Sequence, residues 1–424
     1  MNIDALTGLG VSEALKEMIK GCFDYTRNSR RCSQYSDLDF VLNGLDLVFE
    51  NKNSGREYLQ YKNEVQGTEI KRSTFFTSLH SDRRKNLIDD ISAAFQKKIE
   101  GLIKPLNLDY YSEFPELIDY DLFAGDGHYI SKSCHTKSNS SKKAIAAGNL
   151  YIQDLRNGFL QLLSPITDGK RRNHEIPVFR DNFYQAPKIQ RKKRIWILDR
   201  AYVDKIWWAR KYSKNELFIT LVKKNFKYNH CGNLDYDPDS PINTGIEADF
   251  WAGLGNSSQA MRFVQYTDPE TKETYRFITT VEDLPPGLIA WLYFKRWTIE
   301  KSFDNLKNDL YERKAWASGE NALQIQAQCT VMAYNFIRLI NSIVVDLFDE
   351  EEKQKFNSKY NKQIIKREEK AKKKGRNIHF FHKVIQRMPK IAAQFIRTIK
   401  NHFRSNIPIK AIIWRLKQAL ILHW

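Results

Sequence analysis

Four polar residues of defined spacing stand out in the stretch LYFKRWTIEKSFDNLK, residues 292–307. They are Tyr293, Arg296, Glu300 and Lys307, at positions i, i+3, i+7 and i+14. In a helix they would lie within about 60° of one another, along the edge of a neighbouring apolar stripe. Such an edge can hold a carboxylate and two cations rigidly beside a cleft. The alternative is ordinary i,i+4 pairing of Arg296 with Glu300 on the surface.

Two aspartates occupy strand positions at which an apolar residue is expected. In YDLFAGDGHYI, residues 120–130, Asp126 shares a strand face with Leu122 and Ala124. Asp199 ends the apolar run IWIL, at the carboxyl end of a strand, where α/β sheets place their ligand crevices. A carboxylate on an inward face is costly unless it is paired or metal-bound. A salt bridge to one of the many Lys and Arg side chains would satisfy either aspartate.

Considered together, Asp126, Asp199 and Glu300 favour metal chemistry. Three carboxylates provide the hard oxygen ligands that Mg²⁺ prefers, so they form a plausible ligand set for two Mg²⁺ ions. The formal net charge of +18 and the pI near 9.4 favour a polyanionic partner. Nucleic acid is the first candidate for this partner, ahead of an acidic membrane surface and of a basic soluble protein with no such partner.

The elements that must position these residues can be predicted from hydrophobic periodicity. Residues 1–105 are expected to be helical, with Ser36 or Asp37 as one N-cap and Pro105 closing the region. The helical periods fall in residues 11–23, 36–50 and 81–104. The period then changes to that of strands.

The central part predicts a mixed sheet. Strands are expected in residues 120–130 and on both sides of Asn157-Gly158, a hairpin signal. A buried central strand at 191–200 is followed by a helix and another strand, which end near residue 224. Three antiparallel strands followed by strand, helix and strand predict a mixed sheet with helices packed on it.

An insertion and two helical regions complete the chain. Residues from about 224 to 284 predict a β-rich subdomain with a hairpin turn at Asp268-Pro269. Pro285-Pro286-Gly287 then opens the helix that carries the four polar residues, and a second helix follows it. Residues 346–424 predict a charged tract and then basic amphipathic helix.

The cysteines and apolar runs give weaker information. Five widely spaced cysteines without a CxxC pair predict free thiols. Cys134/His135 and His230/Cys231 could each be half of a zinc site, but no second half has the usual spacing, which favours ordinary loop residues. The sequence contains no run of eighteen apolar residues and no signal-peptide core, so a cytoplasmic protein is expected.

These motifs resemble the DDE transposases of bacterial insertion sequences, in the subgroup with a Y-x₂-R-x₃-E-x₆-K signature. The signature is present without a gap as Tyr293, Arg296, Glu300 and Lys307. AGDGHYI resembles the first-aspartate strand of the family. LDRAY resembles its second-aspartate motif, in which Ala201 replaces the usual Gly. The β-rich insertion also falls between the second aspartate and the glutamate, and the resemblance covers about residues 70–345.

The resemblance implies an α/β fold: an RNase H-like mixed sheet flanked by helices, with a β-rich insertion and helical N- and C-terminal regions. The catalytic domain would span residues 106–345, with the insertion at about 224–284. Residues 1–105 would bind the DNA ends, and residues 346–424 would form a basic helical region.

The resemblance also implies a site. Asp126, Asp199 and Glu300 would be the catalytic residues and would hold two Mg²⁺ ions, for which Mn²⁺ can substitute. The ions would promote cleavage at the transposon end, and the freed 3′-OH would then attack target DNA. Arg296 and Lys307 would grip phosphates on the open side of the carboxylates.

Three aromatic residues are expected to support DNA binding or packing. Tyr293 would add a phosphate hydrogen bond. Trp251, in the insertion, would either stack on an unpaired base near the cut or simply pack in the fold. Trp297 points away from the four-residue stripe on a helical wheel, which predicts core packing.

The expected partners are double-stranded DNA, as terminal inverted repeats and as target, and a second copy of the chain in a homodimeric synaptic complex. No membrane is involved, and the protein would be bacterial and nucleoid-associated. Two other functions stay open from the sequence. One is a non-catalytic DNA-binding protein derived from a transposase, and the other is a metal-dependent nuclease on the same fold.

Overall fold

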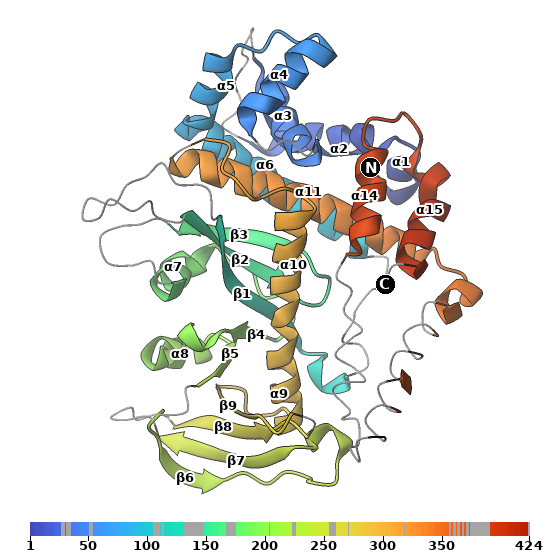
Figure 1. Cartoon of the computed structure of the whole chain (residues 1–424). Coiled ribbons are helices and arrows are strands. Elements are labelled where there is room, and N and C mark those ends of the chain that lie inside the picture. Colours follow the sequence, from blue (N-terminus) through green and yellow to red (C-terminus); the bar gives the residue numbers. More distant parts are fainter. Residues whose placement is uncertain are drawn as a thin grey trace.

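A computed structural model shows one large sheet with helices on both faces and a helical region above one end (Figure 1). It describes residues 1–26, 30, 35–50, 54–104, 111, 114–130, 147–166, 175–202, 204–222, 226–253, 260–269, 271–317, 319–355 and 391–422, together with single residues between 358 and 373. The predicted fold class, a mixed α/β protein with a helix-flanked mixed sheet, is confirmed. This arrangement is consistent with an RNase H-like transposase fold.

Helices make up the N-terminal region, as its periodicity predicts. They are α1 (Ile3–Thr7), α2 (Val11–Lys20), α3 (Asp37–Phe49), α4 (Gly55–Gln66), α5 (Arg72–Leu79) and α6 (Asp82–Ile103). Ser36 is the N-cap of α3, because its hydroxyl accepts a hydrogen bond from the Asp39 amide. Ser81 caps α6 in the same way through the Arg84 amide. Pro105 lies outside the described residues.

The sheet has nine described strands. They are β1 (Tyr120–Ile130), β2 (Ala147–Asp154), β3 (Leu160–Ile166), β4 (Lys193–Leu198), β5 (Glu216–Leu221), β6 (Asn229–Asn233), β7 (Ile246–Gly253), β8 (Ala260–Thr267) and β9 (Thr274–Thr279). Their order across the sheet is β3-β2-β1-β4-β5-β9-β8-β7-β6. The ladders β1–β4 and β4–β5 are parallel, and the other ladders are antiparallel.

Both predicted hairpins are present. The turn between β2 and β3 contains Asn157 and Gly158, and Gly158 adopts φ +78°. β8 and β9 turn at Asp268, whose amide donates to the Glu273 carbonyl. The strands of the insertion do not form a separate sheet, because β9 pairs directly with β5 through Ile219 and its neighbours. The insertion therefore lengthens the central sheet.

The two faces of the sheet pack against different helices. Alternate residues such as Leu122, Ala124 and Ile197 join the core beneath α9 (Pro286–Lys295), α10 (Trp297–Asn308) and α11 (Glu320–Asp346). Residues of opposite parity, such as Phe123 and Trp196, pack against α7 (Glu175–Asn182) and α8 (Lys205–Tyr212). The strand period of two thus separates two apolar clusters.

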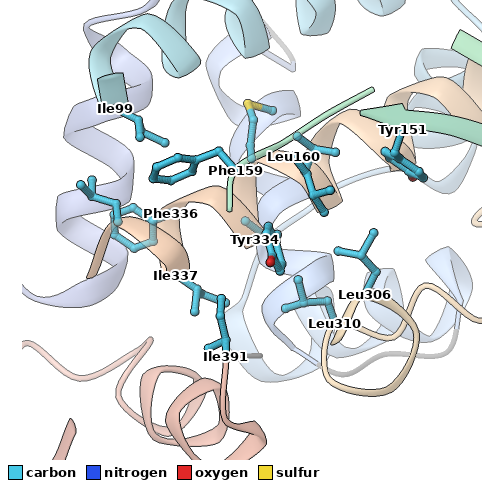
Figure 2. Packing of buried hydrophobic residues seen from close by; sticks show 14 of the residues in the cluster. Ile99, Tyr151, Phe159, Leu160, Leu306, Leu310, Tyr334, Phe336, Ile337 and Ile391 are labelled. Carbon is cyan, nitrogen blue, oxygen red and sulfur yellow. The ribbon is translucent and has the colours of Figure 1, made fainter. Parts of the chain in front are cut away.

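Several segments far apart in the sequence meet in the larger cluster. Figure 2 shows Ile99 of α6, Phe159 and Leu160 beside the β2–β3 turn, Leu306 of α10 and Phe336 of α11 packed together. The long helix α11 runs between the sheet and the N-terminal helices (Figure 1). Among the described residues, no helix combines the length and apolarity needed to cross a membrane.

The helix predicted to carry the four polar residues is broken into two. Arg296 separates α9 from α10, although its backbone keeps right-handed helical angles (φ −52°, ψ −35°). The Arg296 amide donates to the Tyr293 carbonyl, and the Ile299 amide donates to the Arg296 carbonyl, both over three residues. These two hydrogen bonds have the 3₁₀ pattern and mark the break between α9 and α10.

Two basic helices end the described chain, as its amphipathic pattern predicts. They are α14 (Ala393–Asn401) and α15 (Ile409–Leu422), which lie side by side near α1 (Figure 1). Most of the charged tract KREEKAKKKGR lies outside the described residues.

Candidate active site

Asp126 and Asp199 are neighbours across the parallel ladder of β1 and β4. The ladder pairs Gly125 with Leu198, so the next residue of each strand is one of the two aspartates. Adjacent strands lie ~4.8 Å apart, which places the two aspartates side by side at the edge where β4 ends. The Asp199 carbonyl accepts from the Thr220 hydroxyl at 2.8 Å and fixes this edge to β5.

The parity of β1 decides which of its aspartates faces the helices. Asp126 follows Leu122 and Ala124 on the face covered by α9 and α10, and its side chain is 17% exposed. Asp121 has the opposite parity and accepts hydrogen bonds from the amides of Gln190 and Arg191. Asp121 is therefore a structural residue, and Asp126 is the one available to the cluster.

Arg296 joins two of the predicted catalytic carboxylates. Its Nη1 lies 2.8 Å from Asp126 Oδ2, and its Nη2 lies 2.9 Å from Glu300 Oε1. The residue is 5% exposed, so it lies between the carboxylates and not on their open side as expected. The i,i+4 pair with Glu300 does form, but one guanidinium also spans from the helix to the strand.

Tyr293 and Asp199 complete the connection. The Tyr293 hydroxyl lies 3.5 Å from Asp199 Oδ1. Burial raises the pKa of Tyr293 to about 12, so the hydroxyl keeps its proton and can donate. Burial opposes the charge of Arg296, but Asp126 and then Tyr293, Asp199 and Glu300 outweigh it and raise the pKa of the guanidinium. Tyr293, Arg296 and the three carboxylates thus belong to one electrostatic cluster.

Lys307 lies outside this cluster, on the same helix as Glu300. It is exposed in the last turn of α10, and its charge is one reason, after burial, that the pKa of His128 falls to about 4. His128 shares the strand face of Asp126, two residues further along β1. Lys307 therefore borders the same face as the carboxylates and is open to a ligand.

The two tryptophans are placed differently from one another. Trp251 is half-buried on β7, directly opposite Arg262 of β8. Four strand spacings separate β7 from β4, so Trp251 lies roughly 19 Å across the sheet from the edge at Asp199 and outside the cluster. The prediction that Trp297 packs in the core is wrong, because Trp297 is 56% exposed at the start of α10. At about 100° per residue, Trp297 lies roughly 140° from the apolar positions Leu292, Ile299 and Phe303, so ordinary helix spacing already places it outward.

A second, buried polar cluster lies behind the first and was not predicted. The Tyr151 hydroxyl donates to Glu312 Oε1 at 3.0 Å, and His128 Nε2 lies 3.5 Å from Glu312 Oε2. Burial raises the pKa of Glu312 to about 8 and lowers that of His128 to about 4, so both are neutral near pH 7. Glu312 follows α10, so this cluster fastens the end of the Glu300 helix to β1 and β2.

The donor chemistry of the cluster suits a divalent cation. Asp126, Asp199 and Glu300 supply oxygen ligands of the kind that Mg²⁺ prefers, around a point that already accommodates the positive charge of Arg296. Within the described part of the chain, no three His, Cys, Asp or Glu side chains are arranged as a ready metal centre. The three carboxylates are connected through Arg296 and Tyr293.

The alternative zinc half-sites do not gain support. His230 Nε2 lies 2.8 Å from Asn233 Oδ1, and the Cys231 thiol donates to the Asn229 carbonyl at 3.4 Å, both on the exposed strand β6. Cys32, Cys134 and His135 lie outside the described residues. The three cysteines that are described, Cys22, Cys231 and Cys329, are free thiols, as predicted.

Comparison with known proteins connects this geometry to a family. The family described as "Transposase DDE domain" matches residues 119–336, half of the chain, and the match includes every predicted site residue. A protein of Synechocystis sp., named as a transposase for insertion sequence element IS4SA, is 24% identical over 234 residues. That alignment covers 48% of this chain and 64% of the relative, so the chain spans less than two thirds of the relative's length.

The matched range starts just before β1 and ends within α11, so it contains both aspartate strands, the insertion, and the helices that carry Tyr293, Arg296, Glu300 and Lys307. The chain therefore belongs to the transposase DDE domain family of insertion sequences.

Proposed function

We propose that this transposase cuts DNA at the ends of its element and joins the freed 3′-OH to target DNA, with Asp126, Asp199 and Glu300 as its catalytic residues. One observation carries the proposal: the parallel register of β1 and β4 makes the two aspartates neighbours, and Arg296 ties Asp126 to Glu300. This arrangement of three carboxylates from distant segments supports the proposal.

The three carboxylates would hold Mg²⁺, with Mn²⁺ as a substitute. When bound, the ions would supply Lewis-acid activation of the attacking oxygen and charge stabilisation at the leaving 3′ oxygen. The chain's own residues orient the substrate. Tyr293 has a protonated hydroxyl that can donate to a phosphate oxygen, and exposed Lys307 provides a point charge two helical turns beyond Glu300 on the same helix face.

Arg296 has two roles in this proposal. In the structure it neutralises Asp126 and Glu300, which would otherwise repel one another. If the carboxylates held cations, the Arg296 guanidinium would be free to bind a phosphate beside the scissile bond through its planar fork. Arg296 would then reach DNA only in the metal-loaded protein.

Other parts of the chain would hold the DNA. Double-stranded terminal repeats would lie on the N-terminal helices, target DNA would approach the carboxylate edge, and two copies of the chain would pair two ends. Trp251 would contact DNA away from the carboxylates, because its place on β7 keeps it outside the cluster.

One observation favours a second candidate, a DNA-binding protein without catalysis. Arg296 already satisfies two of the three carboxylates, and the described residues contain no ready metal centre. A nuclease that cuts without joining is the third candidate, and it differs from a transposase only in the second step.

A cleavage and strand-transfer assay separates the three candidates. The substrate is duplex DNA carrying the inverted repeats that flank this reading frame, with Mg²⁺ or Mn²⁺ added. Asp126→Asn, Asp199→Asn and Glu300→Gln should each abolish cleavage and leave DNA binding intact, because binding resides mainly in phosphate contacts elsewhere. Asp304→Asn is the matched control, since Asp304 is an exposed carboxylate one helical turn beyond Glu300.

The outcomes are distinct. Cleavage with joined products establishes the transposase. Cleavage without joining indicates the nuclease, and binding without cleavage in the wild type indicates the non-catalytic protein. A carboxylate variant that still cuts at the wild-type rate would remove that residue from the catalytic set.

A further inference from the structure

The hairpin of α14 and α15 is basic without any acidic residue. Glu369 is the last acidic residue of the chain, so nothing after it offsets the cations of the hairpin. Its lysines and arginines are Arg397, Lys400, Arg404, Lys410, Arg415 and Lys417. Such a surface attracts polyanions if its cations are not already bound to carboxylates or carbonyl groups of the same chain.

Three of these cations contact other parts of the molecule. Lys400 Nζ donates to the Asp309 carbonyl at 2.6 Å, and burial lowers the pKa of Lys400 to about 8. Arg404 forms an ion pair with Glu50, and Lys417 Nζ lies 2.5 Å from Glu352 Oε2. These residues attach the hairpin to the rest of the molecule.

The other three cations face outward. Arg397 and Lys410 are exposed and have no carboxylate partner among the residues that the structure describes. The Arg415 guanidinium lies 5.2 Å from the centre of the exposed Trp414 ring, and its Nη1 lies 3.2 Å from His402 Nε2. These contacts orient Arg415 without neutralising it.

A groove of about 340 Å³ runs between the two helices beside Trp414 and Arg415. The rest of its polar lining comprises His402 and the uncharged residues Gln394, Thr398, Asn401 and Gln418. Arg397 lies three residues after Gln394, and Lys410 lies four residues before Trp414, so helical spacing places both cations along the rims of the groove. Cations therefore line the rims, and hydrogen-bond donors line the interior.

We propose that the groove between α14 and α15 binds the sugar-phosphate backbone of DNA, as a contact separate from the catalytic carboxylates. Amide and hydroxyl groups donate to phosphate oxygens, and arginines and lysines supply charge. Trp414, which is 61% exposed, offers a flat apolar surface to a sugar or an unpaired base. The inference rests on the proposed function only in taking DNA as the polyanion.

The position of the hairpin supports this partner. Asn305 Nδ2 donates to the Ile391 carbonyl at 3.2 Å, and Asp309 accepts from Lys400, so α14 is fastened to the end of α10. Asp309 is nine residues beyond Glu300, roughly 14 Å along a helix axis. That distance corresponds to about four nucleotides of a strand, so DNA at the carboxylate edge can continue onto the hairpin.

The test measures binding of a short fluorescent duplex of arbitrary sequence to the full chain in EDTA, over a range of salt concentrations. Arg397→Ala/Lys410→Ala should lower the slope of log affinity against log salt by about two, and Arg415→Ala by about one. Against this duplex, where Trp414 can contact only a sugar, Trp414→Ala should weaken binding about 2-fold or more at fixed salt with an unchanged slope. Arg210→Ala/Lys214→Ala removes the same charge from exposed positions at the end of α8 and should leave the slope unchanged.

Several results would overturn the inference. The first is an unchanged slope of log affinity against log salt in the hairpin variants. The second is a slope that changes equally in the control pair. A loss of self-association in sedimentation with normal DNA binding would make a second copy the occupant, and a loss of binding to phosphatidylserine vesicles alone would make it a lipid. Arg415→Lys should retain the slope, which separates lost charge from lost folding. Because no cleavage is measured, these results are independent of the carboxylate variants that test the proposed function.

Discussion

Arg296 Nη1 and Asp126 Oδ2 lie 2.8 Å apart although 170 residues separate them in the chain. The contact connects the break between α9 and α10 to the middle of β1. It is largely buried on the arginine side, so removing either partner leaves an uncompensated charge.

Arg296→Met should therefore lower the free energy of unfolding in EDTA by about 3 kcal/mol. Added Mg²⁺ should recover part of this loss, since a metal ion can replace the missing positive charge between Asp126 and Glu300. Urea unfolding with and without Mg²⁺ measures both effects. Arg262→Met is the matched control, because Arg262 forms a buried ion pair with the single carboxylate Asp249. Equal Mg²⁺ responses of the two variants would argue against a metal at Asp126 and Glu300.

Lys307 should contact DNA phosphate directly, because it is exposed beside the carboxylate face. Lys307→Ala should reduce the salt slope of binding to the element's ends by about one. Lys301→Ala provides the control, since Lys301 is exposed on the same helix but about 100° from Glu300. Fluorescence anisotropy over a salt range gives both slopes, and a slope unaltered by Lys307→Ala would place this residue away from the phosphates.

Glu312 should make stability fall as pH rises. Burial raises its pKa from 4.5 to about 8, so the folded state retains a proton that the unfolded chain has released. The contribution of this group to stability is full below pH 4.5 and is lost as pH rises through 8. Glu312→Gln keeps a neutral group that can accept from Tyr151, so its stability should depend less on pH between 5 and 8. Urea unfolding at several pH values tests this, and parallel pH profiles would show that Glu312 is ionised in the fold.

Gly158 should resist substitution for two reasons. Its φ of +78° is unfavourable for other residues, and a Cβ would lie within 2.2 Å of the Arg338 guanidinium. Gly158→Ala should destabilise the protein by about 2–3 kcal/mol. Gly67 also has a positive φ, but a Cβ there meets nothing within 4 Å, so Gly67→Ala should cost only about 1 kcal/mol. Thermal unfolding of the two variants measures both losses of stability. Gly67→Ala reports the cost of the positive φ alone, and Gly158→Ala reports that cost together with the steric clash with Arg338.

The sheet could be predicted because strand and turn preferences are local. β1 was predicted to its end residues, since its alternation and the Asp126 parity are carried by eleven consecutive residues. The hairpin at Asn157-Gly158 could be predicted from that dipeptide alone. The place of Asp199 directly after β4 was predicted from the apolar run IWIL that precedes it.

Long-range contacts could not be predicted in the same way. The helix pattern around Arg296 is continuous in sequence, and the break there accompanies a contact with β1 that no local signal encodes. The exposure of Trp297 is a different case, because its helical position opposite the apolar stripe could have been read from the sequence. Glu312 contacts Tyr151, which lies 161 residues away in the chain. Nothing in the sequence around Glu312 indicates that its carboxyl group is buried. The break at Arg296 and the burial of Glu312 depend on tertiary packing.

The pairing of β9 with β5 also bears on how this protein can be shortened. An insertion carried on two flexible linkers can be excised, whereas β9 completes the hydrogen bonds of a core strand. Cutting out β6–β9 and rejoining the ends would leave the N–H and C=O groups of β5 open to strands of other molecules. A minimal version of the protein would therefore have to retain at least one strand of the insertion, or carry charged residues along β5, to avoid aggregating.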